Sequence, residues 1–270
     1  MAGLAFTLIL VQWMLNWEHA TIARSPEYVT WSVFASVGVV IYWHVFARTR
    51  VHINAPSRTA FVVSAIAYVI FAGLVLLLLT GRAPAGTLPW VMRPIYLVAE
   101  FCAAPAVLTL WLSRPRLQKI RLHGPGALNN LLTIRCDISR SLIGLSLIAS
   151  TGLINTAVLR KAHIAHGLEP ELFPVALILA YGGVLSGIVA LIYIPAFLTW
   201  RDKATALVNT AYPVPKDAQP TEEWTDGRTR LTELISPENP ITKTVGTALS
   251  ILAPFATAVL AYYLPDLNQK

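Results

Sequence analysis

The sequence predicts an all-helical integral membrane protein, a polytopic bundle with six or seven transmembrane spans. Of its 270 residues, 55% are hydrophobic and only 13% are charged, whereas soluble globular chains carry about 25% charged residues. The mean hydropathy is +0.58. A water-soluble fold of this size could not hide that much apolar surface, and a bilayer removes the requirement.

Six apolar segments are long enough, or nearly so, to cross a bilayer, whose hydrocarbon core of about 30 Å needs about 20 helical residues. A shorter apolar segment, 4–17, has three interpretations: a span, a helix in the membrane interface, or a signal peptide. We favour a span, because no Lys or Arg precedes the segment as a signal peptide requires. The chain is then a single membrane domain, 1–270, and the six longer spans are 28–47, 60–80, 89–113, 141–159, 172–200 and 242–264.

The distribution of cations predicts the orientation of the chain. The connections after the spans 28–47, 89–113 and 172–200 carry 14 Lys and Arg residues, against six on the opposite side. Because cytosolic connections carry the excess of cations, we expect these three connections and the N-terminus in the cytosol, with the C-terminus outside. The expected location is a plasma membrane of bacterial type, with an organelle membrane as the alternative.

The net charge of +7 would suggest a nucleic-acid partner in a soluble protein. Here the cations flank apolar segments, so we expect the lipid bilayer as the partner and no nucleic acid. The basic segment 114–140 is predicted to be a cytosolic loop that contacts anionic lipid headgroups, although control of topology explains the same charges equally well. The cations expected at the headgroups are Arg114, Arg116, Lys119 and Arg121.

The longest cytosolic connection, 201–240, is predicted to contain a short amphipathic helix over residues 224–235. An interfacial helix, a plug under the bundle and a docking site all remain open for it. Its apolar side carries Trp224, Leu231, Leu234 and Ile235.

Rows of small residues predict close helix packing, because helices in lipid associate through near backbone approach and polar contacts. A pore-lining face or the contact face of a homo-oligomer is the alternative. Prolines at positions 105, 195 and 254 interrupt three spans, and each removes a backbone donor. The small residues are Ser146, Ser150, Gly182, Gly183, Ser186, Gly187, Gly246 and Ser250.

Glu100 is the most informative residue, because it is the only acidic side chain well inside a predicted span. A carboxylate there is costly unless it is paired, protonated or hydrated. Tyr96 and Arg93 precede it by one and two helical turns, and Asn155 lies near the outer end of the span 141–159. These four residues form the predicted ion or substrate path, and the alternative is a buried structural carboxylate.

No cofactor or metal is expected. A haem centre would need a second histidine inside the bundle besides His44. His163 and His166, with a neighbouring glutamate, are the remaining candidates for metal binding.

Three classes of function remain open, since the chain carries no phosphate-binding loop, zinc-protease motif, nucleophile elbow or dinucleotide fingerprint. We favour a channel-like or transporter-like protein with an ion or proton site at Glu100. The second class is a membrane signalling, assembly or defence component that acts through its cytosolic loops. The third is an intramembrane enzyme acting on a lipid-like substrate, for example an isoprenoid, with Glu100 as general acid.

Overall fold

The computed structural model describes residues 26–263, except for 52, 54, 56, 81–88, 124–125, 166, 168, 216–219 and 236–239. Within this range, the side chains of residues 78–80, 89–94, 172, 240–245 and 261–263 are also not described. The predicted segment 4–17 therefore lies outside the described residues.

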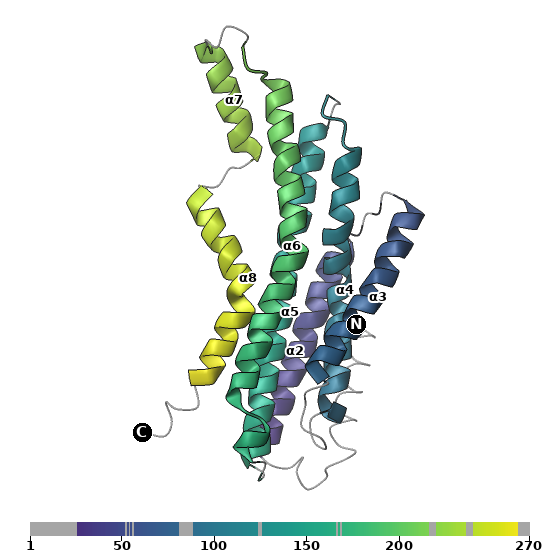
Figure 1. Cartoon of the computed structure of the whole chain (residues 1–270), viewed down its shortest axis with the longest axis vertical. Coiled ribbons are helices and arrows are strands. Elements are labelled where there is room, and N and C mark those ends of the chain that lie inside the picture. The colour runs from purple at the N-terminus through teal and green to yellow at the C-terminus, as the bar shows by residue number, and fades with distance from the viewer. Residues whose placement is uncertain are drawn as a thin grey trace.

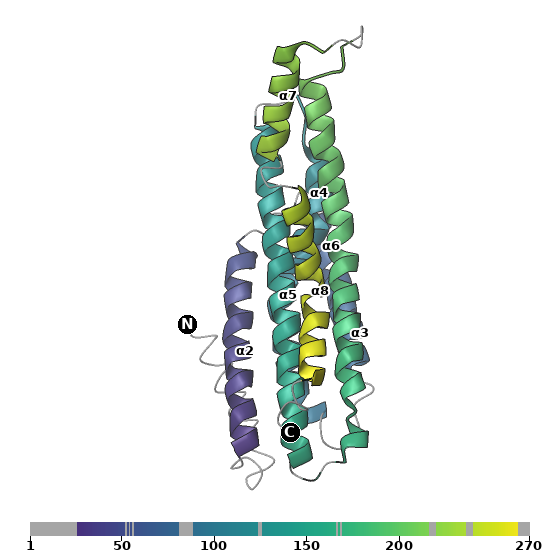
Figure 2. The same cartoon turned by 90° about the vertical axis from the view of Figure 1, so that its left-hand side faces the viewer.

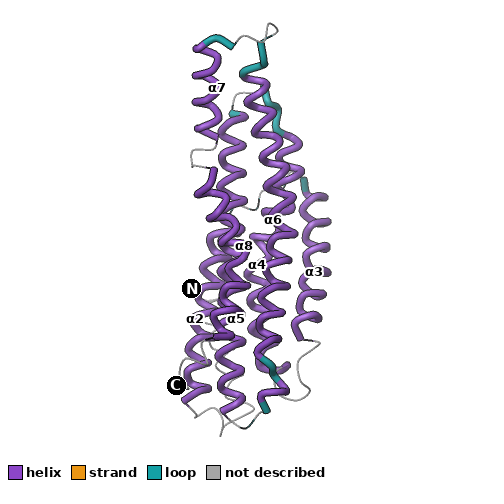
Figure 3. Tube along the Cα trace, turned by 60° about the vertical axis from the view of Figure 1, so that its left-hand side comes forward, coloured by secondary structure: helices purple, strands orange, loops and turns teal. Residues whose placement is uncertain are grey.

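Every regular element of the described residues is a helix, and loops and turns connect the helices, as Figure 3 shows. Five of its helices are long and apolar enough to cross a membrane, namely α2, α3, α4, α5 and α6. The helix α8 contains a shorter apolar stretch, Gly246–Leu260. In chain order the helices are α2 (Pro26–Arg50), α3 (Arg58–Thr80), α4 (Pro89–Lys119), α5 (Ala127–Ala165), the short 3-10 helix η2 (Pro170–Leu172), α6 (Val175–Ala211), α7 (Glu222–Ile235) and α8 (Pro240–Tyr263).

The outer surface of the bundle carries many large apolar side chains that are exposed. On α3, Val69 is 70% exposed and Leu74 is 61% exposed, and Leu191 of α6 is 72% exposed. Large aliphatic side chains exposed in this density would be costly in water, where about 25 cal/mol is lost per Å² of apolar surface. The surface is that of a membrane protein, with these side chains against lipid.

Helix α5 is the central element of the bundle. It packs against α2, α4, α6 and α8, and Figure 2 shows it between α2 and α8. Helix α3 packs chiefly on α4, so it forms one edge of the bundle in Figures 1 and 3. The core between these helices contains large side chains that are fully buried, including Trp31, Tyr42, Leu110 and Leu153.

Three helices extend well beyond the predicted spans they contain, and the first of them is α4, which ends at Lys119 instead of at residue 113. Helix α5 begins at Ala127, although residues 114–140 were expected to form a loop, and α6 continues to Ala211 beyond the span 172–200. Charged residues lower the hydropathy of the first turns of α5, but buried Leu131, Ile134 and Ile138 recur at helical spacing there. At about 1.5 Å per residue the 39 residues of α5 extend roughly 58 Å, well beyond the hydrocarbon core.

Helix α7 lies in the region where an amphipathic helix over residues 224–235 was expected. Figure 1 shows α7 and the last turns of α6 projecting beyond α2 and α3, and we call this part of the molecule the α7 end. Arg228 ties α7 to the end of α6, since its guanidinium donates to the Tyr212 carbonyl at 3.0 Å and to Asn209 at 2.8 Å. Ile235 is buried at the last turn of α7, whereas Leu234 is 60% exposed.

Candidate functional site

Glu100 lies on α4 opposite Tyr68 of α3. The Tyr68 hydroxyl donates to the backbone carbonyl oxygen of Glu100 and also lies 3.3 Å from the carboxylate oxygen Oε2. Tyr68 is 7% exposed, so this contact is largely shielded from its surroundings. It holds the peripheral helix α3 against α4 at the level of the carboxylate.

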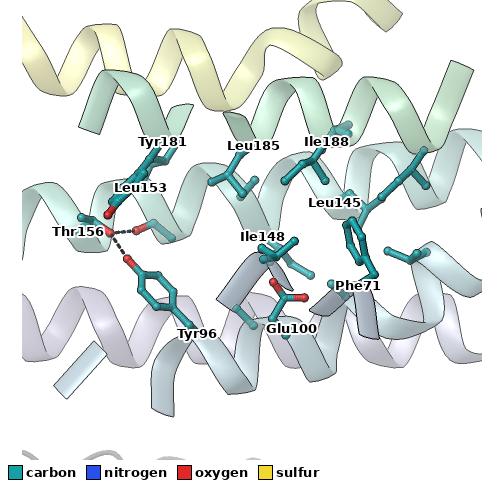
Figure 4. A pocket seen from close by; sticks show the side chains of 18 residues that line it. Phe71, Tyr96, Glu100, Leu145, Ile148, Leu153, Thr156, Tyr181, Leu185 and Ile188 are labelled. Carbon is teal, nitrogen blue, oxygen red and sulfur yellow. Dashed lines mark hydrogen bonds between the residues drawn. The ribbon is translucent and has the colours of Figure 1, made fainter. Parts of the chain in front are cut away.

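A cavity of about 90 Å³ adjoins Glu100. Figure 4 shows the Glu100 carboxylate directed toward this space, with Ile148 of α5 beside it and Leu185 and Ile188 of α6 on the far side. Helices α3, α4, α5 and α6 all contribute to the lining, and most of the lining side chains are apolar. The lining from α3 consists of Phe71 and Val75.

One end of the cavity carries three further hydroxyl groups, those of Tyr96, Thr156 and Tyr181. The Tyr96 and Thr156 hydroxyls are 3.0 Å apart, and Thr156 donates to the Gly152 carbonyl at 2.8 Å (Figure 4). Because the single Thr156 proton is used there, Tyr96 is the donor in its bond with Thr156. Tyr96 thus points along the cavity to α5 rather than to Glu100, one turn away on the same helix.

The arrangement of the four helices indicates how the cavity meets its surroundings. Helix α4 packs on α3, α5 and α6, and α5 packs on α6, whereas α3 and α6 make little contact with each other. The cavity is therefore least tightly closed between α3 and α6. In a bilayer this side faces lipid, as the exposed apolar side chains of α3 do.

The structure separates the residues of the predicted path. Glu100 and Tyr96 line one cavity, but Asn155 faces α2, where a Cβ on Gly38 would come within 2.6 Å of its Nδ2 atom. Asn155 is 1% exposed, and neither polar atom of its amide has a hydrogen-bond partner within the described residues. The side chain of Arg93 lies outside the described part of the structure.

The small residues are divided between an interface and a free surface. Gly182 lies at the contact of α6 with α8, where an added Cβ would come within 2.5 Å of Ala258 Cβ. Gly183 and Gly187 are exposed on another side of α6, where an added Cβ meets no atom within 4 Å. Gly246 is also exposed and lines a second cavity.

Four serines of the same predicted set lie at or near the helix contacts. Ser146 donates to the Ser250 carbonyl across α5 and α8, and Ser186 accepts from the Phe255 amide. The Ser150 hydroxyl is buried and has no hydrogen-bond partner within the described residues.

The basic segment contains an ion pair that the sequence pattern did not predict. Asp137 of α5 accepts from Arg116 of α4 at 3.2 Å, and Arg140 lies 4.0 Å from its other carboxylate oxygen. The Asp137 side chain is 4% exposed. Arg116, expected at lipid headgroups, thus contacts a carboxylate, whereas Arg114, Lys119 and Arg121 are exposed. The helical spacing of Asp137 from buried Ile134 and Ser141 is the signal that could have placed it inside.

Within the described residues, no three His, Cys, Asp or Glu side chains come close enough together to hold a metal ion. His163 instead pairs with Tyr28, whose hydroxyl lies 2.9 Å from Nδ1, and His166 is outside the described residues. No family model, curated protein or solved structure matches the chain.

Proposed function

We propose that this integral membrane protein binds a lipid-like molecule in the cavity beside Glu100, with the polar end of the ligand at the carboxyl group. The observation that carries the proposal is a single carboxyl group directed into a cavity between four helices whose lining beside that group is mostly apolar. A prenol or a fatty alcohol, which joins an apolar chain to one hydroxyl group, has the matching chemistry.

The chemistry of the cavity supports a ligand that is mostly apolar. Moving a carboxyl group from water into an apolar cavity costs free energy unless another polar group forms a hydrogen bond with it. The Tyr68 hydroxyl, whose one proton goes to the Glu100 backbone carbonyl, lies 3.3 Å from Oε2 and leaves the carboxyl oxygens available on the cavity side. A ligand hydroxyl at Glu100 would supply a second contact, while its chain would leave between α3 and α6 into lipid.

The same lining argues against an ion path as the first choice. A conducting path needs a polar lane that reaches both faces of the membrane. Beside Glu100 the lining side chains from α5 and α6 are aliphatic, and the hydroxyl groups of the cavity lie together at one end.

We also propose that the α7 end lies in the cytosol, because most of the cations of the chain belong to segments at this end.

The test uses a prenol and a fatty alcohol that both carry a photoreactive diazirine, added to the purified protein in nanodiscs. We expect peptides from the cavity to be labelled, and excess unlabelled prenol to compete. Glu100→Gln should reduce labelling roughly tenfold, which corresponds to about 1.4 kcal/mol of binding. Ala99→Leu should block labelling, because Ala99 lines the cavity.

The matched control is Ala104→Leu, which adds the same side chain to α4 at a partly buried position outside the cavity lining. Equal labelling of wild type, Glu100→Gln and Ala99→Leu would contradict the proposal. Ion flux into proteoliposomes that Glu100→Gln removes would also contradict it and would favour the ion path.

A further inference from the structure

A second cavity lies between α5, α6 and α8, near the α7 end of the bundle and apart from the Glu100 cavity. It has a volume of about 350 Å³. Its lining is amphipathic, because Arg135, Ser139 and Thr247 contribute polar groups while Leu142 and Phe197 contribute apolar ones. Such a division between a polar and an apolar part is what a headgroup and the start of an acyl chain require.

Arg135 is the charged group of this cavity. Its guanidinium lies over the Trp200 ring, 5.6 Å from the ring centroid, and it donates to the Ile235 carbonyl at the end of α7. Among the described residues no carboxylate pairs with Arg135. A guanidinium has five N–H donors in a planar fork that matches phosphate, so the contact with Ile235 leaves most of them available.

The surrounding groups hold the guanidinium in place. The Trp200 indole is 3% exposed and donates to the Leu131 carbonyl at 2.9 Å, which fixes the ring that Arg135 covers. Tyr193 is 4% exposed, lies near Arg135 and has its hydroxyl beside Thr247. The Arg135 guanidinium is therefore held against buried aromatic rings, unlike the cation of a long side chain on an exposed surface.

The position of the cavity along α5 corresponds to a membrane boundary. Gly144 of α5 lies against Val45 and Thr49, in the last turns of α2. The apolar lining at Leu142 and Ile143 is at this level. Arg135 lies nine residues before Gly144, roughly 13 Å further toward the α7 end at about 1.5 Å per residue. Tryptophan and arginine at this depth are typical of the headgroup region.

We propose that this cavity binds the phosphate group of an anionic phospholipid, with the phosphate on Arg135 and the first acyl carbons beside Leu142 and Ile143. The charge complementarity is direct, since the cavity presents a cation with spare donors and hydroxyl groups around it. The same chemistry would accept free phosphate, so the experiment separates the two sources.

The test is native mass spectrometry of the protein released from nanodiscs of phosphatidylcholine with and without phosphatidylglycerol. Wild type should retain phosphatidylglycerol in preference to phosphatidylcholine. Arg135→Gln should lose this preference by roughly tenfold, a difference of about 1.4 kcal/mol. Arg230→Gln is the matched control, because it removes the same charge from an exposed position on α7.

A second variant keeps Arg135 and its contacts. Gly246 lines the cavity, and a Cβ added there meets no atom within 4 Å, so Gly246→Leu should fill the space without distorting the helices. It should displace phosphatidylglycerol as Arg135→Gln does. Unchanged retention in both variants would overturn the proposal. If inorganic phosphate displaces the lipid, and Gly246→Leu still binds inorganic phosphate, the natural ligand is free phosphate and the proposal of a phospholipid is wrong.

Discussion

The Ser146 hydroxyl of α5 lies 2.5 Å from the backbone carbonyl oxygen of Ser250 in α8. In a regular helix that carbonyl would accept from the amide of residue 254, but Pro254 has no N–H group. The next amide, that of Phe255, donates to the Ser186 hydroxyl of α6 at 3.1 Å. Two serines from neighbouring helices thus satisfy backbone groups around the proline, as a helix in lipid requires.

Replacing Ser146 with Ala should therefore lower the free energy of unfolding by about 1–3 kcal/mol, the cost of leaving a buried acceptor without a donor. The hydroxyl also lies 2.9 Å from the Leu142 carbonyl, but that group keeps its own helical partner. The measurement is unfolding in mixed detergent micelles, followed by far-UV circular dichroism.

A double-mutant cycle isolates the contact with Ser250. Pro254→Ala restores an N–H group beneath the Ser250 carbonyl, so Ser146→Ala should cost clearly less in that background. An identical cost of Ser146→Ala in both backgrounds would show that the serine does not act through the proline site.

The Asp137 ion pair predicts a large effect from one isosteric change. Asp137→Asn removes the charge opposite Arg116 and Arg140 and leaves the partly buried Arg116 guanidinium without its carboxylate. We expect a loss of about 3 kcal/mol in the free energy of unfolding, because the remaining Arg116 charge stays partly buried without a carboxylate to offset its desolvation. The same unfolding measurement applies.

Asp202→Asn is the control for this prediction. Asp202 pairs with Arg201 at 3.8 Å, and the two side chains are 73% and 61% exposed. An exposed pair contributes at most about 1 kcal/mol, so this variant should unfold almost as wild type does. Equal losses for the two variants would mean that burial does not set the strength of the Asp137 pair.

Hydropathy was sufficient to predict an all-helical protein with apolar, membrane-sized helices, because lipid requires every backbone group of a span to bond internally. It could not predict the start of α5, where charged Arg135, Asp137 and Arg140 hide the helical spacing of the buried residues. The number of spans depends on the short segment 4–17, whose length is below that of a typical span. The orientation depends on where the Lys and Arg residues lie, which hydropathy does not describe.

Hydropathy singled out Glu100 but not its surroundings. The contact with Tyr68 joins residues 32 apart on two different helices, and it depends on how each helix is rotated about its axis. A one-residue change in that rotation, about 100°, would direct the carboxylate elsewhere. The separation of Asn155 from the cavity has the same cause, because Asn155 and Thr156 differ by one such step along α5.

Asn155 should be replaceable by a residue of similar size without loss of stability. Its amide is buried against α2 and has no hydrogen-bond partner within the described residues, although the Tyr42 hydroxyl lies beside it. An unsatisfied buried polar group costs about 1–3 kcal/mol, so Asn155→Leu should leave the thermal midpoint in detergent unchanged or raise it. A fall of several degrees would show that the amide makes a stabilising contact.

The hydroxyl of Tyr68 should affect both stability and ligand binding. Tyr68→Phe keeps the ring against Phe71 and Trp111 but removes the donor to the Glu100 carbonyl, which should cost about 1 kcal/mol of unfolding free energy. Without that anchor the Glu100 carboxyl is less firmly held toward the cavity, so photolabelling by the diazirine prenol should also fall, roughly tenfold at most.

Tyr28→Phe separates these two effects, because its hydroxyl pairs with His163 of α5, outside the lining of the Glu100 cavity. It removes the same group and should cost a similar amount of stability, yet leave photolabelling at the wild-type level. A loss of labelling that follows stability equally in both variants would mean that Tyr68 acts only by holding α3 on α4. A loss of labelling in Tyr68→Phe but not in Tyr28→Phe would show that the Tyr68 hydroxyl positions the Glu100 carboxyl group for ligand binding.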